Sequence, residues 1–200
     1  MNPLNSVIGT IVSGFILAAV IIFALGSGQL NMMELIVWFH VLAGVVWIGL
    51  LYYFNFVQVP GVGKALSEAN NGGPGPAAIN KYIAPTALAW FRWGALATWI
   101  TGFAALEKWG ITSQAFSFEG FTFESNTSIM GIGAWLGTIM LFNVWGLIWP
   151  NQKKILGMKE ATAEEIAGAK KIALMASRTN TLLSIPMLLC MTAYTHNLPY

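Results

Sequence analysis

The sequence has little charge, no aspartate and only one cysteine. Charged residues make up 9% of its 200 residues, and all eight acidic residues are glutamates, whereas about a quarter of an ordinary soluble domain is charged. With Cys190 alone, the chain has no intrachain disulfide and no cysteine-based metal site. The hydrophobic fraction of 56% and the mean hydropathy of +0.64 therefore indicate a polytopic membrane protein.

Five segments are long and apolar enough to cross a bilayer, which takes about 20 helical residues. The sequence predicts a single membrane domain with transmembrane helices at about residues 7–25, 33–57, 83–106, 129–149 and 172–195. Because an open sheet would leave backbone groups unpaired in lipid, we expect an all-α bundle of five helices. Pro60 and Pro150 are expected to end the second and fourth helices. The first segment lacks a basic region and a clear cleavage site, so we expect a retained helix rather than a signal peptide.

The lysines are distributed unequally between the two sides of this bundle. Two connections, between the second and third helices and between the fourth and fifth, carry Lys64, Lys81, Lys153, Lys154, Lys159, Lys170 and Lys171. The other side carries only Lys108. The positive-inside rule then predicts a cytoplasmic N-terminus and a C-terminus on the outer side. We expect a multi-pass protein of the bacterial inner (plasma) membrane, so that the C-terminus is periplasmic. Because topology accounts for the basic residues, the net charge of +2 gives no indication of nucleic-acid binding.

Three connecting segments have patterns of their own. Residues 61–82 are expected to be irregular, because Gly, Pro and Asn gather at their centre. Thr162 and Glu165 have the spacing of a capping box, which predicts a short surface helix before the fifth span. Residues 110–128 alternate phenylalanine with polar residues, and we interpret them as a short hairpin or an aromatic flap.

One ionisable residue, His40, lies inside the second apolar run, about two turns from its start. On a helix, His40, Ala43, Gly44 and Trp47 share one face. That face could receive a flat, bulky ligand beside the imidazole, or simply the close approach of another helix. Ionisable residues inside a span usually have a partner or a function, and both interpretations stay open.

The predicted topology places the other histidine, His196, in the same outer half of the bilayer. Two imidazoles on different helices at similar depth are what a bis-histidine haem b site requires. We therefore predict haem b with His40 and His196 as ligands of the haem iron, and with Gly44 and Trp47 beside the porphyrin. His196 is expected to lie up to a turn or two higher than His40. The alternative is that both histidines only pack or make hydrogen bonds.

Two arginines, Arg92 and Arg178, lie in the inner half of the predicted bundle. Both could extend their side chains to the inner interface, which is the usual behaviour of arginine near a helix end. The functional alternative is an anion or substrate pocket completed by Asn143 and Asn180.

Four blocks of the sequence resemble a known family in matching order. They read WFHVLAGVVWIGLLYYFNF, LAWFRWGALATWITGF, GIGAWLGTIMLFNVWGLIWPNQKK and ASRTNTLLSIPMLLCMTAYTHN. These blocks resemble the membrane domain of PuuD-type urate hydroxylases, which are membrane-bound, cytochrome-c-linked urate oxidases. A more distant similarity is to HemJ-like and CopD-like helical membrane proteins. The motif positions are occupied by His40, Arg92, Asn143, Asn151, Arg178, Asn180 and His196.

The resemblance implies an integral-membrane redox protein that binds haem b and passes electrons to a periplasmic cytochrome c. The family's oxidase form carries further helices and a C-terminal cytochrome c domain, and no Cys-x-x-Cys-His motif occurs in this sequence. Urate hydroxylation therefore cannot simply be carried over from the family to this chain. The alternative is a non-catalytic accessory subunit of a larger respiratory or oxidase complex in the lipid bilayer.

Overall fold

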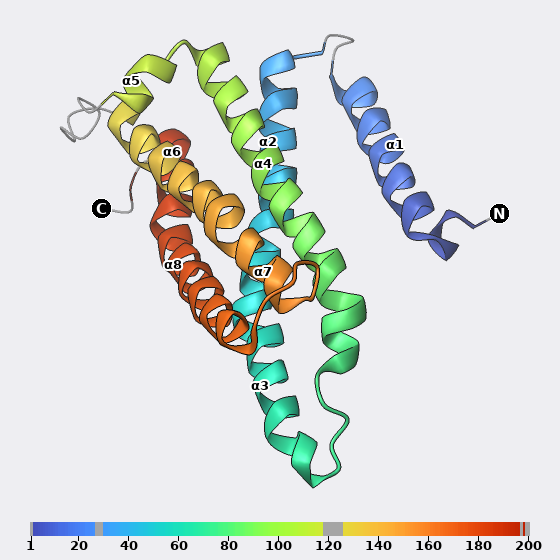
Figure 1. Cartoon of the computed structure of the whole chain (residues 1–200). Helices are drawn as coiled ribbons and strands as arrows, with labels where there is room; N and C mark the ends of the chain where they lie inside the picture. Colours follow the sequence, from blue (N-terminus) through green and yellow to red (C-terminus); the bar gives the residue numbers. More distant parts are fainter. Residues whose placement is uncertain (1, 27–29, 118–125, 197, 199–200) are drawn as a thin grey trace. The chain divides into compact units, whose positions relative to one another are not determined.

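The computed structural model describes residues 2–26, 30–117, 126–196 and 198. These residues are helical apart from short connections, and no strand occurs among them (Figure 1). The chain divides into two compact units, Met1–Leu35 and Ile36–Tyr200. We describe each unit by itself.

The first unit contains the short 3₁₀ helix η1 (Pro3–Asn5) and the apolar helix α1 (Val7–Leu25). Ser6 caps α1, because its side-chain oxygen accepts a hydrogen bond from the backbone N–H of Gly9 at 3.0 Å. The bounds of α1 agree with the first predicted span.

The other helices form an antiparallel arrangement in which α6, η6 and α7 lie along α8, and α4 lies beside α2 (Figure 1). The α-helices are α2 (Met32–Tyr53), α3 (Val59–Glu68), α4 (Ala84–Trp109), α5 (Thr112–Phe116), α6 (Asn126–Phe142), α7 (Trp149–Ile155) and α8 (Ala163–His196). Four shorter helical segments join them, the 3₁₀ helix η3 (Ala69–Asn71) and the π-helices η2 (Phe54–Gln58), η4 (Ile79–Ile83) and η6 (Asn143–Ile148).

Each π-helical segment is followed by a proline in the first turn of the next helix. The three prolines are Pro60 after η2, Pro85 after η4 and Pro150 after η6. A proline has no N–H to donate, and its ring crowds the carbonyl four residues earlier. The wider π turn accommodates both effects, so the helix continues through the proline. Pro60 and Pro150 thus do not end their helices, which run continuously over Met32–Asn71 and Thr127–Ile155.

Two connections in the structure differ from the sequence prediction. Residues 61–82 are mostly helical, and the irregular backbone is confined to residues 72–76, where Gly72 and Gly75 adopt positive φ angles of 82° and 66°. The surface helix predicted before the fifth span is the start of α8, which runs unbroken for 34 residues.

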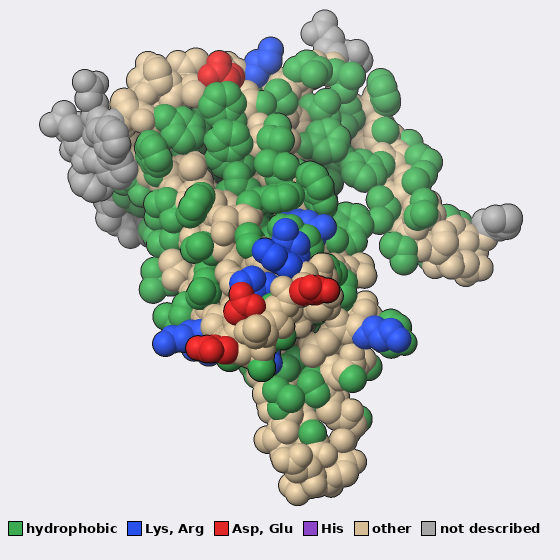
Figure 2. Space-filling model, viewed as in Figure 1, with side chains coloured by type: hydrophobic (Ala, Val, Ile, Leu, Met, Phe, Trp, Pro, Cys, Tyr) green, Lys and Arg blue, Asp and Glu red, His purple; other side chains and the backbone are tan. Residues whose placement is uncertain are grey.

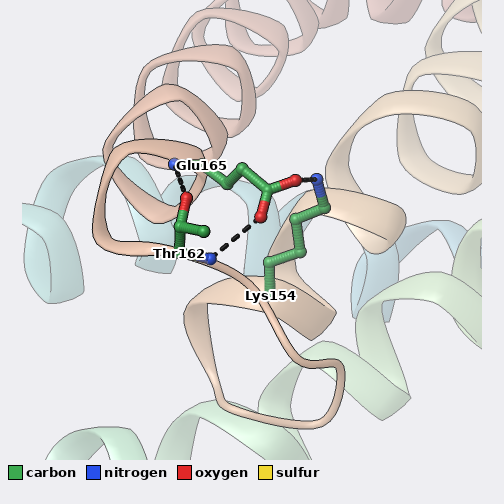
Figure 3. A network of polar contacts seen from close by, with 3 residues as sticks. All are labelled: Lys154, Thr162 and Glu165. Atoms are coloured by element: carbon green, nitrogen blue, oxygen red, sulfur yellow. Dashed lines mark hydrogen bonds and ion pairs between the residues drawn. The ribbon is translucent and has the colours of Figure 1, made fainter.

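The predicted capping box is present at the start of α8. Glu165 N–H donates to the side-chain oxygen of Thr162 at 3.2 Å, and Thr162 N–H donates to Glu165 Oε2 at 2.9 Å (Figure 3). Lys154 Nζ lies 3.5 Å from Glu165 Oε1, which ties the end of α7 to the start of α8.

The segment after α4 begins with α5 and not with a strand. Phe116 at the end of α5 makes ring contacts with Phe103 and Trp135 at centroid distances of 6.2 and 5.6 Å. The rest of the predicted hairpin or flap, residues 118–125, lies outside the described residues.

Among the described residues, four helical stretches are long and apolar enough to cross a membrane, which supports the all-helical membrane class. They are Val7–Leu25, Met32–Asn71, Thr127–Ile155 and Ala163–His196. The helix predicted as the third span, α4, has the necessary length of 26 residues. It is not among the four stretches, and it contains Arg92, Glu107 and Lys108.

The main apolar core lies between α2, α4, η6 and α8. Its most deeply buried large side chains are Trp47, Leu51, Phe91, Met140 and Val144, each at most 2% exposed. This core determines how α2 is rotated about its axis, and it therefore also determines where His40 points.

Candidate functional site

His40 makes a well-defined hydrogen bond to the backbone of α4. Its Nδ1 lies 2.8 Å from the carbonyl oxygen of Thr98, and the Thr101 hydroxyl lies 3.4 Å from the same nitrogen. Because a carbonyl oxygen can only accept, Nδ1 must carry the proton and donate it. In the neutral ring, the lone pair is then on Nε2, which has no hydrogen-bond partner in the described part of the chain.

A glycine on α4 makes room for this imidazole. A Cβ atom at Gly102 would lie 2.8 Å from His40 Cε1 and 3.0 Å from Nδ1, which is too close for either contact. The same Cβ would lie 3.8 Å from Nε2. The absence of a side chain at Gly102 therefore lets the His40 ring lie against α4. In this orientation, Nε2 is farther from Gly102 than Nδ1 is.

The rest of the His40 face of α2 also packs against α4. A Cβ atom at Gly44 would be 3.8 Å from the Thr98 methyl group, and one at Gly94 would be 3.4 Å from the backbone N of Trp47. Trp47 is only 2% exposed. Gly44 and Trp47 thus lie against a neighbouring helix, which was one of the two interpretations of this face. A porphyrin would have to meet His40 from the Nε2 side.

His40 and His196 lie at equal distances along their helices from a common contact. The Tyr52 hydroxyl and the Ser184 hydroxyl are 3.0 Å apart, Tyr52 follows His40 by twelve residues, and Ser184 precedes His196 by twelve. Twelve residues of helix rise about 18 Å, and α2 and α8 run in opposite directions. Along their helix axes, the two histidines are therefore equally far from this contact and lie on the same side of it. His196 is exposed at the C-terminal end of α8, and no described contact joins it to His40.

Asn143 and Asn180, which were predicted as members of an anion or substrate pocket, make a hydrogen bond to each other. Asn143 Nδ2 donates to Asn180 Oδ1 at 2.8 Å, and Asn180 Nδ2 donates to the carbonyl oxygen of Met140 at 2.9 Å. Asn180 is 0% exposed. Both functional groups of its amide are thus used inside the protein, where an unpaired polar group would be costly. Asn143 also lines a pocket of about 380 Å³ with Lys171 and Thr179.

A second set of polar contacts joins the end of α2 and the following η2 to α8. Asn55 Nδ2 donates to the Leu51 carbonyl and to the Ser177 hydroxyl at 2.9 and 2.8 Å, and Tyr52 contacts Ser184 as described above. Sequence reasoning missed Tyr52, Ser177 and Ser184 as members of this set of contacts. Their signal was the spacing in α8, where Ser177, Asn180 and Ser184 recur every three or four residues on one helix face.

The two arginines are not brought together by any described contact. The Arg92 guanidinium carbon lies 3.8 Å from the centroid of the Trp149 ring, and the Trp145 N–H donates to the Arg92 carbonyl at 3.2 Å. Arg178 is exposed on α8. Among the described residues, no three His, Cys, Asp or Glu side chains gather in the way that a multidentate metal site requires.

These features define an all-helical membrane protein with one histidine whose ring is oriented by a backbone carbonyl. Residues 108–200 match the family described as urate oxidase N-terminal. The resemblance to the urate hydroxylase membrane domain is thereby confirmed for this part of the chain, which contains Asn143, Asn180 and His196. His40 and Arg92 precede the matched residues. No curated protein and no solved structure matches the chain.

Proposed function

We propose that this protein is an integral-membrane redox protein, related to the membrane-bound urate oxidases, that binds haem b and passes electrons to a periplasmic cytochrome c. In this proposal, α4 crosses the bilayer as a fifth span, the N-terminus is cytoplasmic and the C-terminus is periplasmic. Haem b would supply one-electron chemistry in the outer half of the membrane.

The observation that supports haem binding best is the hydrogen bond from His40 Nδ1 to the Thr98 carbonyl at 2.8 Å. Histidines that ligate metals almost always donate their other ring N–H to a carbonyl, a carboxylate or water, which orients the ring and raises its basicity. His40 has this arrangement, and its Nε2 carries the available lone pair. The residues present therefore fit a haem ligand at this position, and His40 and His196 would hold the haem.

A reduced-minus-oxidised absorption spectrum of the purified protein tests the proposal. We expect a b-type spectrum in the wild type and its loss in His40→Ala. The matched control is Thr192→Ala, which removes a hydroxyl that bonds only within α8, to the carbonyls of Leu188 and Leu189. Absence of b-type absorbance from wild-type protein purified with added haem would contradict the proposal.

The electron acceptor requires a separate measurement. Rapid mixing of the reduced protein with oxidised soluble cytochrome c should reoxidise the protein haem, because both proposed ligands lie near the outer surface. His40→Ala should not reduce the cytochrome above the background rate. A wild-type haem that stays reduced in the presence of cytochrome c would remove this part of the proposal.

A second candidate function is a non-catalytic accessory subunit of a larger respiratory or oxidase complex. It is favoured by a groove of about 610 Å³ between α2 and α4, lined mainly by apolar residues that include Val45, Leu50 and Trp90. Gly49 lies in this groove, and a Cβ atom there would meet no atom within 4 Å. A transmembrane helix of a partner subunit could pack closely at such a position. Stoichiometric co-purification of a partner without any haem would favour this function.

A further inference from the structure

Two cations contact one tryptophan ring where α4 meets α7. The Arg92 guanidinium carbon lies 3.8 Å from the centroid of the Trp149 ring, and Lys153 Nζ lies 5.7 Å from the same centroid. Arg92 comes from α4, whereas Trp149 and Lys153 stand one turn apart on α7. All three side chains are half-buried. Figure 2 shows Lys and Arg side chains gathered over α7.

Neither cation has an acidic partner in the part of the chain that the structure describes. The ion pairs found there join Lys64 to Glu68 and Lys154 to Glu165. Glu165, the acidic residue bound at the end of α7, also accepts the N–H of Thr162. Within the described part of the chain, neither Arg92 nor Lys153 therefore forms an ion pair.

The stacking on Trp149 leaves the hydrogen-bond donors of Arg92 available. A guanidinium group stacks through its flat face, while its five N–H groups point outward in the plane of the group. No described hydrogen bond uses these N–H groups as donors. The edge of the Arg92 guanidinium and the ammonium of Lys153 therefore present donors and positive charge beside the same ring. Phosphate oxygens match such a set of donors.

The position of this cluster along the helix indicates where the phosphate comes from. Apolar η6 ends just before Trp149, and the polar sequence Asn151, Gln152, Lys153 and Lys154 follows Pro150. Tryptophan is enriched at this boundary between hydrocarbon and headgroups, and basic residues there attract anionic lipids. We propose that Arg92 and Lys153, held against Trp149, bind the headgroup phosphate of an anionic phospholipid. The site does not depend on haem binding.

Native mass spectrometry of the purified full chain titrated with dioleoylphosphatidylglycerol tests this proposal. Removing each charge should weaken lipid binding about fivefold, so we expect about a fivefold loss in Lys153→Gln and a larger loss in Arg92→Gln/Lys153→Gln. Lys153→Gln keeps the Arg92–Trp149 stack in place, so its effect does not depend on a damaged fold. Lys159→Gln removes an exposed lysine from the same side of the protein and should bind the lipid like the wild type.

Two further ligands identify the source of the phosphate. Dioleoylphosphatidylcholine, whose headgroup has no net charge, should bind more weakly to the wild type and with little difference between variants. Inorganic phosphate should not displace phosphatidylglycerol at millimolar concentration, and full displacement would assign the site to the free ion instead of a lipid. Equal phosphatidylglycerol binding by the wild type and Arg92→Gln/Lys153→Gln would overturn the proposal.

Discussion

Among single residues, Gly102 has the most direct effect on the candidate site. It permits the His40 ring to lie against α4, since any Cβ atom at this position would be 2.8 Å from Cε1. A larger side chain must move the imidazole away from the Thr98 carbonyl and so disturb the tautomer that leaves Nε2 free. Gly102 is thus a positioning residue for His40 and need not touch the cofactor.

We predict that Gly102→Ala lowers haem affinity by about 10–100-fold, as is typical when a group that orients a metal ligand is lost. Gly49→Ala is the matched control, because its added Cβ atom would meet nothing within 4 Å. Haem titration of the two apo-proteins measures the difference. Equal affinities would show that the contact between Gly102 and His40 does not position a ligand.

The buried Asn143–Asn180 pair gives a prediction about stability. Asn180→Ala removes one member and leaves the Asn143 amide and the Met140 carbonyl without their partners. We expect a loss of about 1–3 kcal/mol in the free energy of unfolding, the usual cost of unpaired buried groups. Reversible unfolding in detergent measures it.

The double variant Asn143→Leu/Asn180→Leu separates the hydrogen bond from packing. Replacing both partners with apolar groups can cost less than removing one, because fewer polar groups stay unpaired. We expect the double variant to be at least as stable as Asn180→Ala. A much less stable double variant would mean that the amides have another, unrecognised partner.

At the scale of elements, apolar periodicity predicted where helices lie but not where they end. Pro60 and Pro150 were interpreted as stops, because proline normally interrupts the hydrogen bonds of a helix interior. The π turns that precede these prolines let the helices continue through them, and the prediction did not allow for such turns. The capping box at Thr162 and Glu165 was predictable because its hydrogen bonds are local.

The capping box should stabilise the first turn of α8. Thr162→Ala removes the oxygen that accepts the Glu165 N–H at 3.2 Å, and such N-cap losses cost about 1 kcal/mol. We therefore expect amide hydrogen exchange at Glu165 to become about fivefold faster. Thr192→Ala, near the other end of the same helix, should leave that amide unchanged. Unaltered exchange in Thr162→Ala would show that the box does not protect this turn.

At the scale of the whole molecule, the all-helical membrane class followed from composition, whereas the neighbours of each helix in the bundle did not. The sequence did not identify the helix beside His40, which contacts α4 through Thr98 and Gly102. Hydropathy gives the depth of a residue along a span, but it does not tell which helix stands beside it. The register between Tyr52 and Ser184 likewise required a three-dimensional contact.

The five-span topology predicts that the two ends of α4 lie on opposite sides of the membrane. In a Cys190→Ala background, Lys108→Cys should react with a membrane-impermeant maleimide from outside the cell. Lys81→Cys should react only in inverted vesicles, because Lys81 precedes α4 and belongs to the predicted cytoplasmic side. Both positions are exposed, so a lack of labelling does not result from burial. Labelling of both from the same side would mean that α4 does not cross the bilayer.

The central claim of this account is that His40 and His196 ligate one haem from opposite faces, and electron paramagnetic resonance of the oxidised protein tests it most directly. Two imidazole ligands make ferric haem low-spin. We predict a low-spin signal in the wild type, a high-spin signal in His196→Ala, which keeps one imidazole, and loss of the haem signal in His40→Ala. An unchanged low-spin signal in both variants would contradict the claim.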